Sequence, residues 1–314
     1  MAGFAAAAAV VGLASAAYQA VGEAGDRRKT APRGRLVDVG GYRLHIMSAG
    51  QGTPAVVVIP AMGSPGSEWL DVQQAIAQET KICLYDRAGL GWSDSPARRR
   101  TAVAMAGELH ALLHCAGTMP PYVLVGHSMG GLVARVFIQL YPDEVAGLAL
   151  IDSSHPGQKS RLPKKGMRNH RGGKLLEAAL AWMRPLGLQR LARDLGLRGP
   201  PSTAWSRHRR AMYGELLAFD AICREVTGGL ADLPLAVVTS SELDPNQPAG
   251  SRGRRDRGRF YPPWAALQDE LATLSANSTH DVSERAGHHV HRDDPGLVIR
   301  VIVALVAQVR STAP

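Results

Sequence analysis

The stretch Val123-Leu124-Val125-Gly126-His127-Ser128-Met129-Gly130-Gly131-Leu132 joins an apolar run to a helical pattern through the motif Gly-x-Ser-x-Gly. The run before it is typical of a buried parallel strand, and apolar residues recur at helical spacing after it, up to Tyr141-Pro142. A serine on so sharp a turn has a strained backbone, and the glycines two residues away on either side remove side chains that would collide. The stretch predicts a strand, a tight turn and a helix, with Ser128 exposed at the tip.

Length and composition indicate one large globular unit. The chain has 314 residues, of which 45% are hydrophobic and 20% are charged, enough for one core plus an insertion. Its three cysteines, Cys83, Cys115 and Cys223, are far apart and show neither metal-binding nor redox spacing. We therefore expect small, buried thiols without a disulfide framework and no metal site.

Strand and helix patterns alternate along the chain outside one central segment. Strands are expected at Leu36–Val39 and Tyr42–Met47, which flank Gly40-Gly41 as a hairpin, and at Ala55–Ile59, Ile82–Tyr85, Tyr122–Val125, Leu148–Ile151 and Leu235–Thr239. Helices are expected at Leu70–Ala77, Val103–Leu113, Leu132–Leu140 and Val298–Val309. The alternation predicts an α/β fold, a mostly parallel twisted sheet with helices on both faces.

The strand pattern lapses between residues 153 and 230, where three helical segments are expected, the last from about Thr203 to Val226. The predicted organisation is an N-terminal segment and linker (1–34), a first core part (35–152), a helical cap (153–230) and a second core part (231–314). From Lys159 to Arg210 the cap holds fourteen Lys or Arg and two acids, a balance of 14 − 2 = +12.

The basic cap bears on possible partners. It can steer anionic substrates or rest on an anionic membrane surface, and the alternative is a solvated face. A second basic run, residues 252–259, is expected as a mobile surface loop. No aromatic residues interleave with this run and no nucleic-acid motif is present, so nucleic acid is not expected as a partner.

The N-terminal residues 2–21 carry no charged side chain, and this length just suffices for a membrane-spanning helix. Arg27, Arg28 and Lys29 follow, which by the positive-inside rule favours a single N-terminal anchor with the main domain in the cytoplasm. The alternatives are a signal peptide cleaved after Ala14-Ser15-Ala16, which would give a secreted protein, and a surface helix.

Several motifs together resemble the α/β-hydrolase fold superfamily, in the subgroup with a helical cap. They are the strand and loop at Pro60–Ser64, the run Asp86–Asp94, the elbow at Ser128, the acid loop near Asp244, and Ala286–His291. All occur in the order that the family uses, from about Arg35 to the end. Many relatives have His-Gly where this chain has Pro60-Ala61, so the loop that helps to bind the oxyanion departs from the family pattern.

The resemblance implies a serine nucleophile, a histidine base and a carboxylate, in that chain order. Ser128 needs a histidine to take its proton, and the family pattern places the base at His288, with His289 and His291 as local competitors. His291 is expected to pack or to form hydrogen bonds nearby.

The acid is expected in the loop beyond the strand Leu235–Thr239, where ligand sites of α/β folds gather. Asp244 is the first candidate in that loop and Glu242 another. Asp152, at the end of the run Leu148–Ile151, is the alternative triad acid, although a hinge or helix-start role is its preferred interpretation.

Oxyanion stabilisation in this fold comes from two backbone amides, and the matching positions are Met62 and Met129. The expected function is a cofactor-independent serine hydrolase that cleaves small carboxylic esters of apolar or amphipathic acyl groups through an acyl-enzyme on Ser128. Thioesterase, amidase and perhydrolase share these residues and stay open. Serine at the elbow argues against relatives with an aspartate nucleophile. The alternative of another class is a non-catalytic receptor or scaffold on the same fold.

Overall fold

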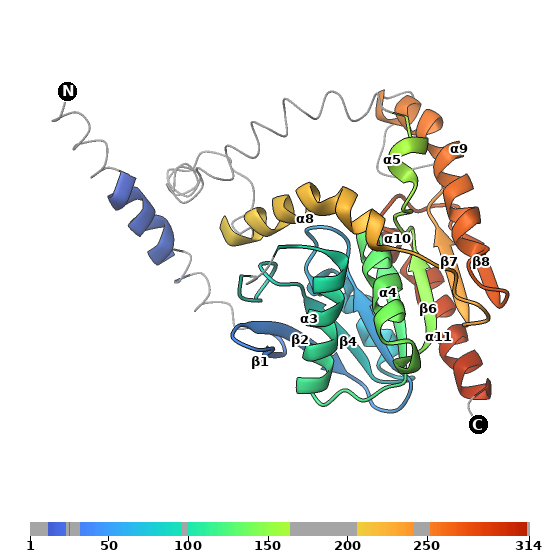
Figure 1. Cartoon of the computed structure of the whole chain (residues 1–314), viewed down its shortest axis with the longest axis horizontal. Helices are drawn as coiled ribbons and strands as arrows, with labels where there is room; N and C mark the ends of the chain where they lie inside the picture. The colour runs from blue at the N-terminus through green and yellow to red at the C-terminus, as the bar shows by residue number, and fades with distance from the viewer. Residues whose placement is uncertain are drawn as a thin grey trace.

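The computed structural model of the chain describes residues 12–22, 25, 32–95, 99–163, 206–241 and 252–312. An eight-stranded sheet forms its centre, with the strand order β1-β2-β4-β3-β5-β6-β7-β8 (Figure 1). The strands are β1 (Arg35–Asp38), β2 (Arg43–Ala49), β3 (Ala55–Ile59), β4 (Ile82–Asp86), β5 (Tyr122–His127), β6 (Val145–Ile151), β7 (Leu235–Thr239) and β8 (Ser278–Val282). Only β1 and β2 are antiparallel to their neighbours; the pairings from β4 to β8 are parallel. The predicted α/β fold class and N-terminal hairpin are confirmed.

The register brings the carboxyl ends of the central strands to one edge. Ile59 of β3 is level with Gly126 of β5, Gly126 with Leu150 of β6, and Ile151 with Val238 of β7. All five residues of β3 and of β7 are buried, because both faces of the sheet are covered. The loops that follow these strands therefore meet at one end of the sheet, where functional groups of parallel sheets gather.

Helices cover both faces of the sheet (Figure 1). The long helices are α2 (Leu70–Ile76), α3 (Ala102–Cys115), α4 (Met129–Leu140), α8 (Ser206–Glu225), α9 (Arg252–Ala272) and α11 (Pro295–Thr312), and the short ones are η1 (Gly66–Trp69), η2 (Pro142–Glu144), α5 (Gln158–Arg161) and α10 (Val290–Asp293). One buried cluster joins α3 and α4 to the sheet through residues such as Leu109 and Phe137. The other joins α2 and α11 to the opposite face through residues such as Ile76 and Ile302. Two apolar layers thus hold the sheet between them.

The second basic run differs from its prediction. Residues 252–259 were expected as a mobile loop, but they form the first part of α9. Arginine is a good helix former, and the later part of α9 buries Trp264, Leu267 and Leu271. Packing of that apolar face fixes the helix from which the basic run extends.

The predicted cap and N-terminal segment lie partly outside the described residues. Residues 164–205 fall outside, whereas α8 falls within the predicted third cap helix. At the N-terminus, residues 12–22 are helical. Among the described residues, α11 is the one helix long and apolar enough to cross a membrane, and its fully buried Val298 and Ile302 make it a core helix of the sheet. The N-terminal anchor stays a prediction.

Candidate active site

Ser128 sits on the turn between β5 and α4, as the sequence predicts. Its backbone has φ 53° and ψ −124°, a positive φ that a non-glycine residue rarely adopts. The flanking glycines are required by close packing: a Cβ on Gly126 would lie 2.5 Å from the Cα of Gly131, and one on Gly130 would lie 2.0 Å from the carbonyl oxygen of Ile59. The turn is therefore fixed by backbone contacts on both sides of Ser128.

His288 lies between Ser128 and a carboxylate. Its Nε2 is 3.0 Å from the Oγ of Ser128, and its Nδ1 is 2.6 Å from Oδ2 of Asp152. An ionised carboxylate can only accept a hydrogen bond, so Nδ1 carries the proton and Nε2 presents a lone pair to the serine hydroxyl. The imidazole is half-buried, whereas the Asp152 side chain is buried. A proton can move from Ser128 to His288 without any rearrangement of these groups.

The carboxylate beside His288 corrects the sequence prediction. Asp244 was the expected partner, but Asp152 occupies that position, directly after β6. Asp244 and its competitor Glu242 lie outside the described residues. Nδ1 of His288 carries one proton and donates it to one carboxylate. Asp152, which directly follows β6, is that carboxylate. Asp152, which the sequence also allowed as the triad acid, is thus the better candidate.

Two further groups hold Asp152 in place. Its Oδ1 accepts hydrogen bonds from the backbone amide of Ser240 and from the indole Nε1 of Trp264, each 2.9 Å long. Burial raises the pKa of this carboxyl, but the hydrogen bonds from His288, Ser240 and Trp264 outweigh burial and leave the pKa below its usual value. Asp152 is therefore ionised near neutral pH. Ser240 and Trp264 are not among the predicted site residues, because neither has a local sequence signature.

Neither competing histidine takes the place of His288 between Ser128 and Asp152. His289 is exposed, and its ring centre lies 5.6 Å from that of His288. His291 is buried, stacks on the ring of Trp69 at 4.2 Å, and has no hydrogen-bond partner among the described residues. His127 donates from Nε2 to the backbone oxygen of His288 at 2.9 Å. Of the predicted catalytic residues, the structure thus brings Ser128 and His288 together.

The predicted oxyanion residues lie on adjoining segments. Met129 is the first residue of α4, so its amide has no acceptor within the helix. The contact of Gly130 with the backbone oxygens of Ile59 and Pro60 shows that the start of α4 packs on the end of β3. The loop that carries Met62 begins there. An oxyanion site between the Met62 and Met129 amides remains a prediction.

A buried ion pair between Arg87 and helix α8 supports this loop. Arg87, which follows β4, donates to Oε1 of Glu215 at 2.7 Å and to Oε2 at 3.0 Å. The same guanidinium donates to the backbone oxygens of Pro60 and Ala61, at 2.6 and 2.7 Å. Glu215 Oε2 also accepts from the amide of Gly63 at 2.9 Å. The residues on both sides of Met62 are therefore bonded to one charged pair that joins strand β4 to helix α8.

A histidine of α8 reaches the same loop. His208 donates from Nε2 to the backbone oxygen of Gly63 at 2.9 Å, and its Nδ1 accepts from the amide of Gly91 at 3.2 Å. Burial is the main cause that lowers the pKa of His208, which suits a neutral ring with one donor and one acceptor nitrogen. The last helix of the predicted cap is thus tied to the loop after β3.

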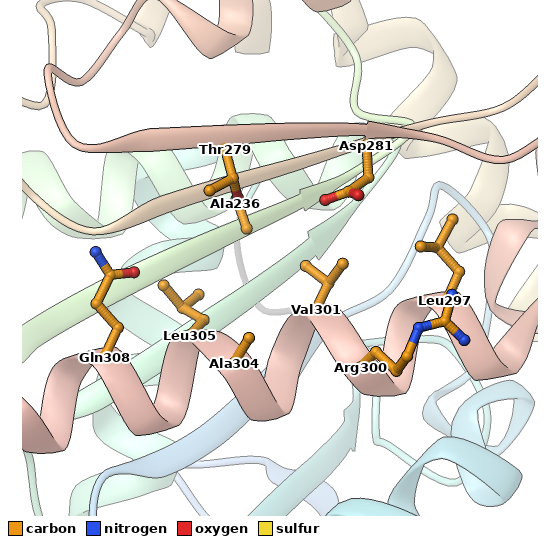
Figure 2. Close-up of a pocket in the computed structure, with 9 residues that line it drawn as sticks. All are labelled: Ala236, Thr279, Asp281, Leu297, Arg300, Val301, Ala304, Leu305 and Gln308. Atoms are coloured by element: carbon orange, nitrogen blue, oxygen red, sulfur yellow. The ribbon is translucent and has the colours of Figure 1, made fainter.

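One cavity lies away from the candidate site. A cavity of about 300 Å³ lies between α11 and the strands β7 and β8. Its lining residues, which include Ala236, Asp281, Val301 and Gln308, are drawn in Figure 2. None of Ser128, Asp152 and His288 lines it. This cavity lies against the face of the sheet under α11, whereas Ser128 and Asp152 follow the carboxyl ends of β5 and β6.

Comparison with known proteins agrees with the fold described above. The model of the alpha/beta hydrolase fold family matches residues 54–187. The solved epoxide hydrolase CorEH superposes with a TM-score of 0.61 at 22% identity, over 88% of this chain and 99% of that chain. An esterase from Thermogutta terrifontis superposes with a TM-score of 0.56 at 21% identity, over 89% and 99%. Residues 54–187 thus match the family model, and the described structure has the α/β-hydrolase fold.

Curated relatives match shorter parts. A putative carbamate hydrolase RutD from Escherichia coli O26:H11 is 37% identical over 101 residues, which cover 32% of this chain and 38% of the relative. The first three curated relatives are matched over 20%, 41% and 39% of their own lengths. This chain therefore spans less than half the length of each of these three curated relatives.

Proposed function

We propose that this protein is a serine hydrolase that cleaves carboxylic esters with apolar or amphipathic acyl groups. The observation that carries the proposal is the continuous chain of hydrogen bonds from Ser128 through His288 to the buried Asp152, at 3.0 and 2.6 Å. These are the contacts that a nucleophile, its base and an orienting carboxylate require. In this proposal Asp152, and not Asp244, is the carboxylate that orients His288.

In the proposed reaction, Ser128 Oγ attacks the ester carbonyl carbon while its proton passes to Nε2 of His288. The carbonyl oxygen becomes an oxyanion, which the amides of Met62 and Met129 would stabilise. His288 then returns the proton to the leaving alcohol, and the acyl group stays on Ser128. Water, activated by His288 in the same way, releases the acid and restores the serine.

An ester is the preferred substrate class, but the geometry serves any carbonyl attacked by serine. One similar structure is described as an esterase and one similar curated protein as a putative carbamate hydrolase. Thioesters, amides and peracids need the same nucleophile and base. A panel of soluble aryl esters of increasing acyl length, compared with an aryl carbamate, separates these classes by kcat/KM.

We predict that a fluorophosphonate probe labels the native chain once and that Ser128→Ala abolishes both labelling and turnover. The phosphonate mimics the tetrahedral intermediate and needs the activated Ser128 hydroxyl. Ser160→Ala is the matched control, because Ser160 is an exposed serine whose hydroxyl donates to the backbone oxygen of Gly157. Labelling that persists in Ser128→Ala, or that disappears in Ser160→Ala, contradicts the proposal.

We further propose that the N-terminal segment holds the protein at a membrane and that the basic cap faces an anionic surface. Deletion of residues 1–28 should leave turnover of a small ester unchanged, because the sheet begins only at Arg35. The shortened protein should bind anionic vesicles, and 1 M salt should release it, since salt screens charges beyond roughly 3 Å at that concentration.

Co-sedimentation with vesicles tests this prediction. Charge reversal of Lys164, Lys165 and Arg168 should weaken binding to anionic vesicles without changing turnover of a soluble ester. Equal binding to neutral and anionic vesicles, or binding to neither, would remove the role of the cap at the membrane.

A further inference from the structure

Three histidines outside the triad form a cluster behind it. One ring nitrogen from each of His127, His289 and His291 lies within 4.8 Å of the other two. His127 is the last residue of β5, directly before Ser128, and the other two lie at the start of α10, directly after His288. His127 and His291 are buried, whereas His289 is exposed, so the cluster can be reached from the surface at His289.

The hydrogen bond of His127 decides which of its nitrogens is available. Its Nε2 lies 2.9 Å from the backbone oxygen of His288, which can only accept, so Nε2 carries the proton. Nδ1 then presents a bare lone pair, and it has no hydrogen-bond partner among the described residues. Histidines that bind metals characteristically donate their other N–H to a carbonyl or carboxylate in this way.

His291 is the second indication of a ligand. Its side chain is 2% exposed, and neither ring nitrogen has a partner in the described part of the chain. The ring lies parallel to that of Trp69, with an interplanar angle of 2°, so stacking fixes its orientation. A buried polar nitrogen without a partner costs about 1–3 kcal/mol. A bound ion would supply a partner to one of these nitrogens and remove that part of the cost.

The charge state of the cluster suits a cation. Burial is the main cause that lowers the pKa of His127 and of His289, and it lowers the pKa of His291 to about 3. The neutral imidazole is the form that binds a metal ion. The Glu68 carboxylate opposes the lowering at His289, so it adds negative charge on that side.

We propose that His127, His289 and His291 bind one divalent transition-metal ion of the zinc class. Three imidazoles with an open fourth position form one of the protein environments that Zn²⁺ accepts, and imidazole also suits Cu²⁺ and Ni²⁺. A Zn–N bond of about 2.0–2.1 Å places tetrahedral ligands about 3.4 Å apart. The three nitrogens, all within 4.8 Å of one another, must therefore approach by up to about 1.4 Å when the ion binds. The sequence expectation of no metal site was based on the spacing of the cysteines. That spacing carries no information about these histidines.

Such an ion would act on the neighbouring triad. The ring centre of His288 lies 5.0 Å from that of His127 and 5.6 Å from that of His289. A bound divalent charge near this imidazole disfavours its protonated form, which the hydrolytic reaction requires. Metal binding should therefore inhibit turnover. This consequence depends on the proposed hydrolase function, whereas metal binding itself does not.

The test is metal binding by the full chain after removal of metals with a chelator. Zn²⁺ titration by calorimetry should show one site per chain, and Co²⁺ should give the visible absorption of a four-coordinate ion. His291→Phe keeps an aromatic ring against Trp69 and removes both nitrogens, so we expect at least a 100-fold loss of affinity. His289→Ala changes an exposed residue, should preserve the fold and should weaken binding similarly.

Two further variants separate this site from others. His110 is also stacked, on Tyr141 at 3.9 Å, so His110→Phe is the matched control and should bind zinc as the native chain does. His288→Ala should retain binding, since His288 is not a ligand in the proposal. The absence of one-to-one binding, unchanged affinity in both His291→Phe and His289→Ala, or loss of binding only in His288→Ala would overturn the proposal.

Discussion

Asp152→Asn should lower kcat by about 10⁴-fold while the protein remains folded. The amide oxygen can still accept from the Ser240 amide and the Trp264 indole, so the side chain keeps its position. Its NH₂ group then faces Nδ1 of His288, which must become an acceptor. The imidazole proton moves to Nε2 and points at Ser128, so His288 can no longer accept the serine proton. Initial rates with a soluble ester, with circular dichroism as the folding check, measure the effect.

Asp244→Asn is the control for this prediction, because sequence reasoning placed the acid there. We expect its kcat to stay within about twofold of the native value, since His288 Nδ1 is already bonded to Asp152. If Asp244→Asn caused the large loss and Asp152→Asn did not, the acid would lie after β7, and the geometry around His288 would not be that of the working enzyme.

The second large effect is expected at the ion pair beneath the loop after β3. Glu215→Ala should destabilise the protein by about 3–5 kcal/mol, because it leaves the Arg87 guanidinium buried without a counter-charge. Arg87 is 1% exposed and Glu215 is fully buried, so water cannot replace the lost carboxylate. Denaturant unfolding of the native and variant chains measures the difference.

The milder Glu215→Gln tests positioning as well as stability. A glutamine amide turns an NH₂ donor toward Arg87 or toward the amide of Gly63, and both of those groups are donors. The loop that carries Met62 should then shift, and kcat should fall by on the order of 10²-fold with a smaller change in KM. Glu225→Gln on the same helix is the control. Glu225 is partly exposed and accepts from the backbone amide of Val103, and the side-chain oxygen of a glutamine can accept the same hydrogen bond. Native kcat and stability in Glu215→Gln would show that the pair has no part in holding the loop.

The sequence determined the features that depend on local spacing. Periods of two and of about 3.6 residues indicate which residues face the core, and from these the hairpin, the central parallel strands and the helices α2, α3, α4 and α11 follow, whereas α9 does not. Gly-x-Ser-x-Gly marked the turn at Ser128, because only glycine allows the close contacts found at Gly126 and Gly130. The position of His288 followed from its family pattern, and the structure places it beside Ser128.

Only the tertiary structure decided between the two acids. Asp152 and Asp244 each follow a strand of the parallel sheet, and each satisfies the order serine, acid, histidine. The choice depends on which carboxylate reaches His288 Nδ1 and finds donors such as Trp264, which is 112 residues away along the chain. The pairing of Arg87 with Glu215 spans 128 residues, and the cluster of His127 with His289 and His291 is equally non-local. Hydrogen bonds and charges act over a few ångströms through space, whereas sequence periodicity reports only burial within one element.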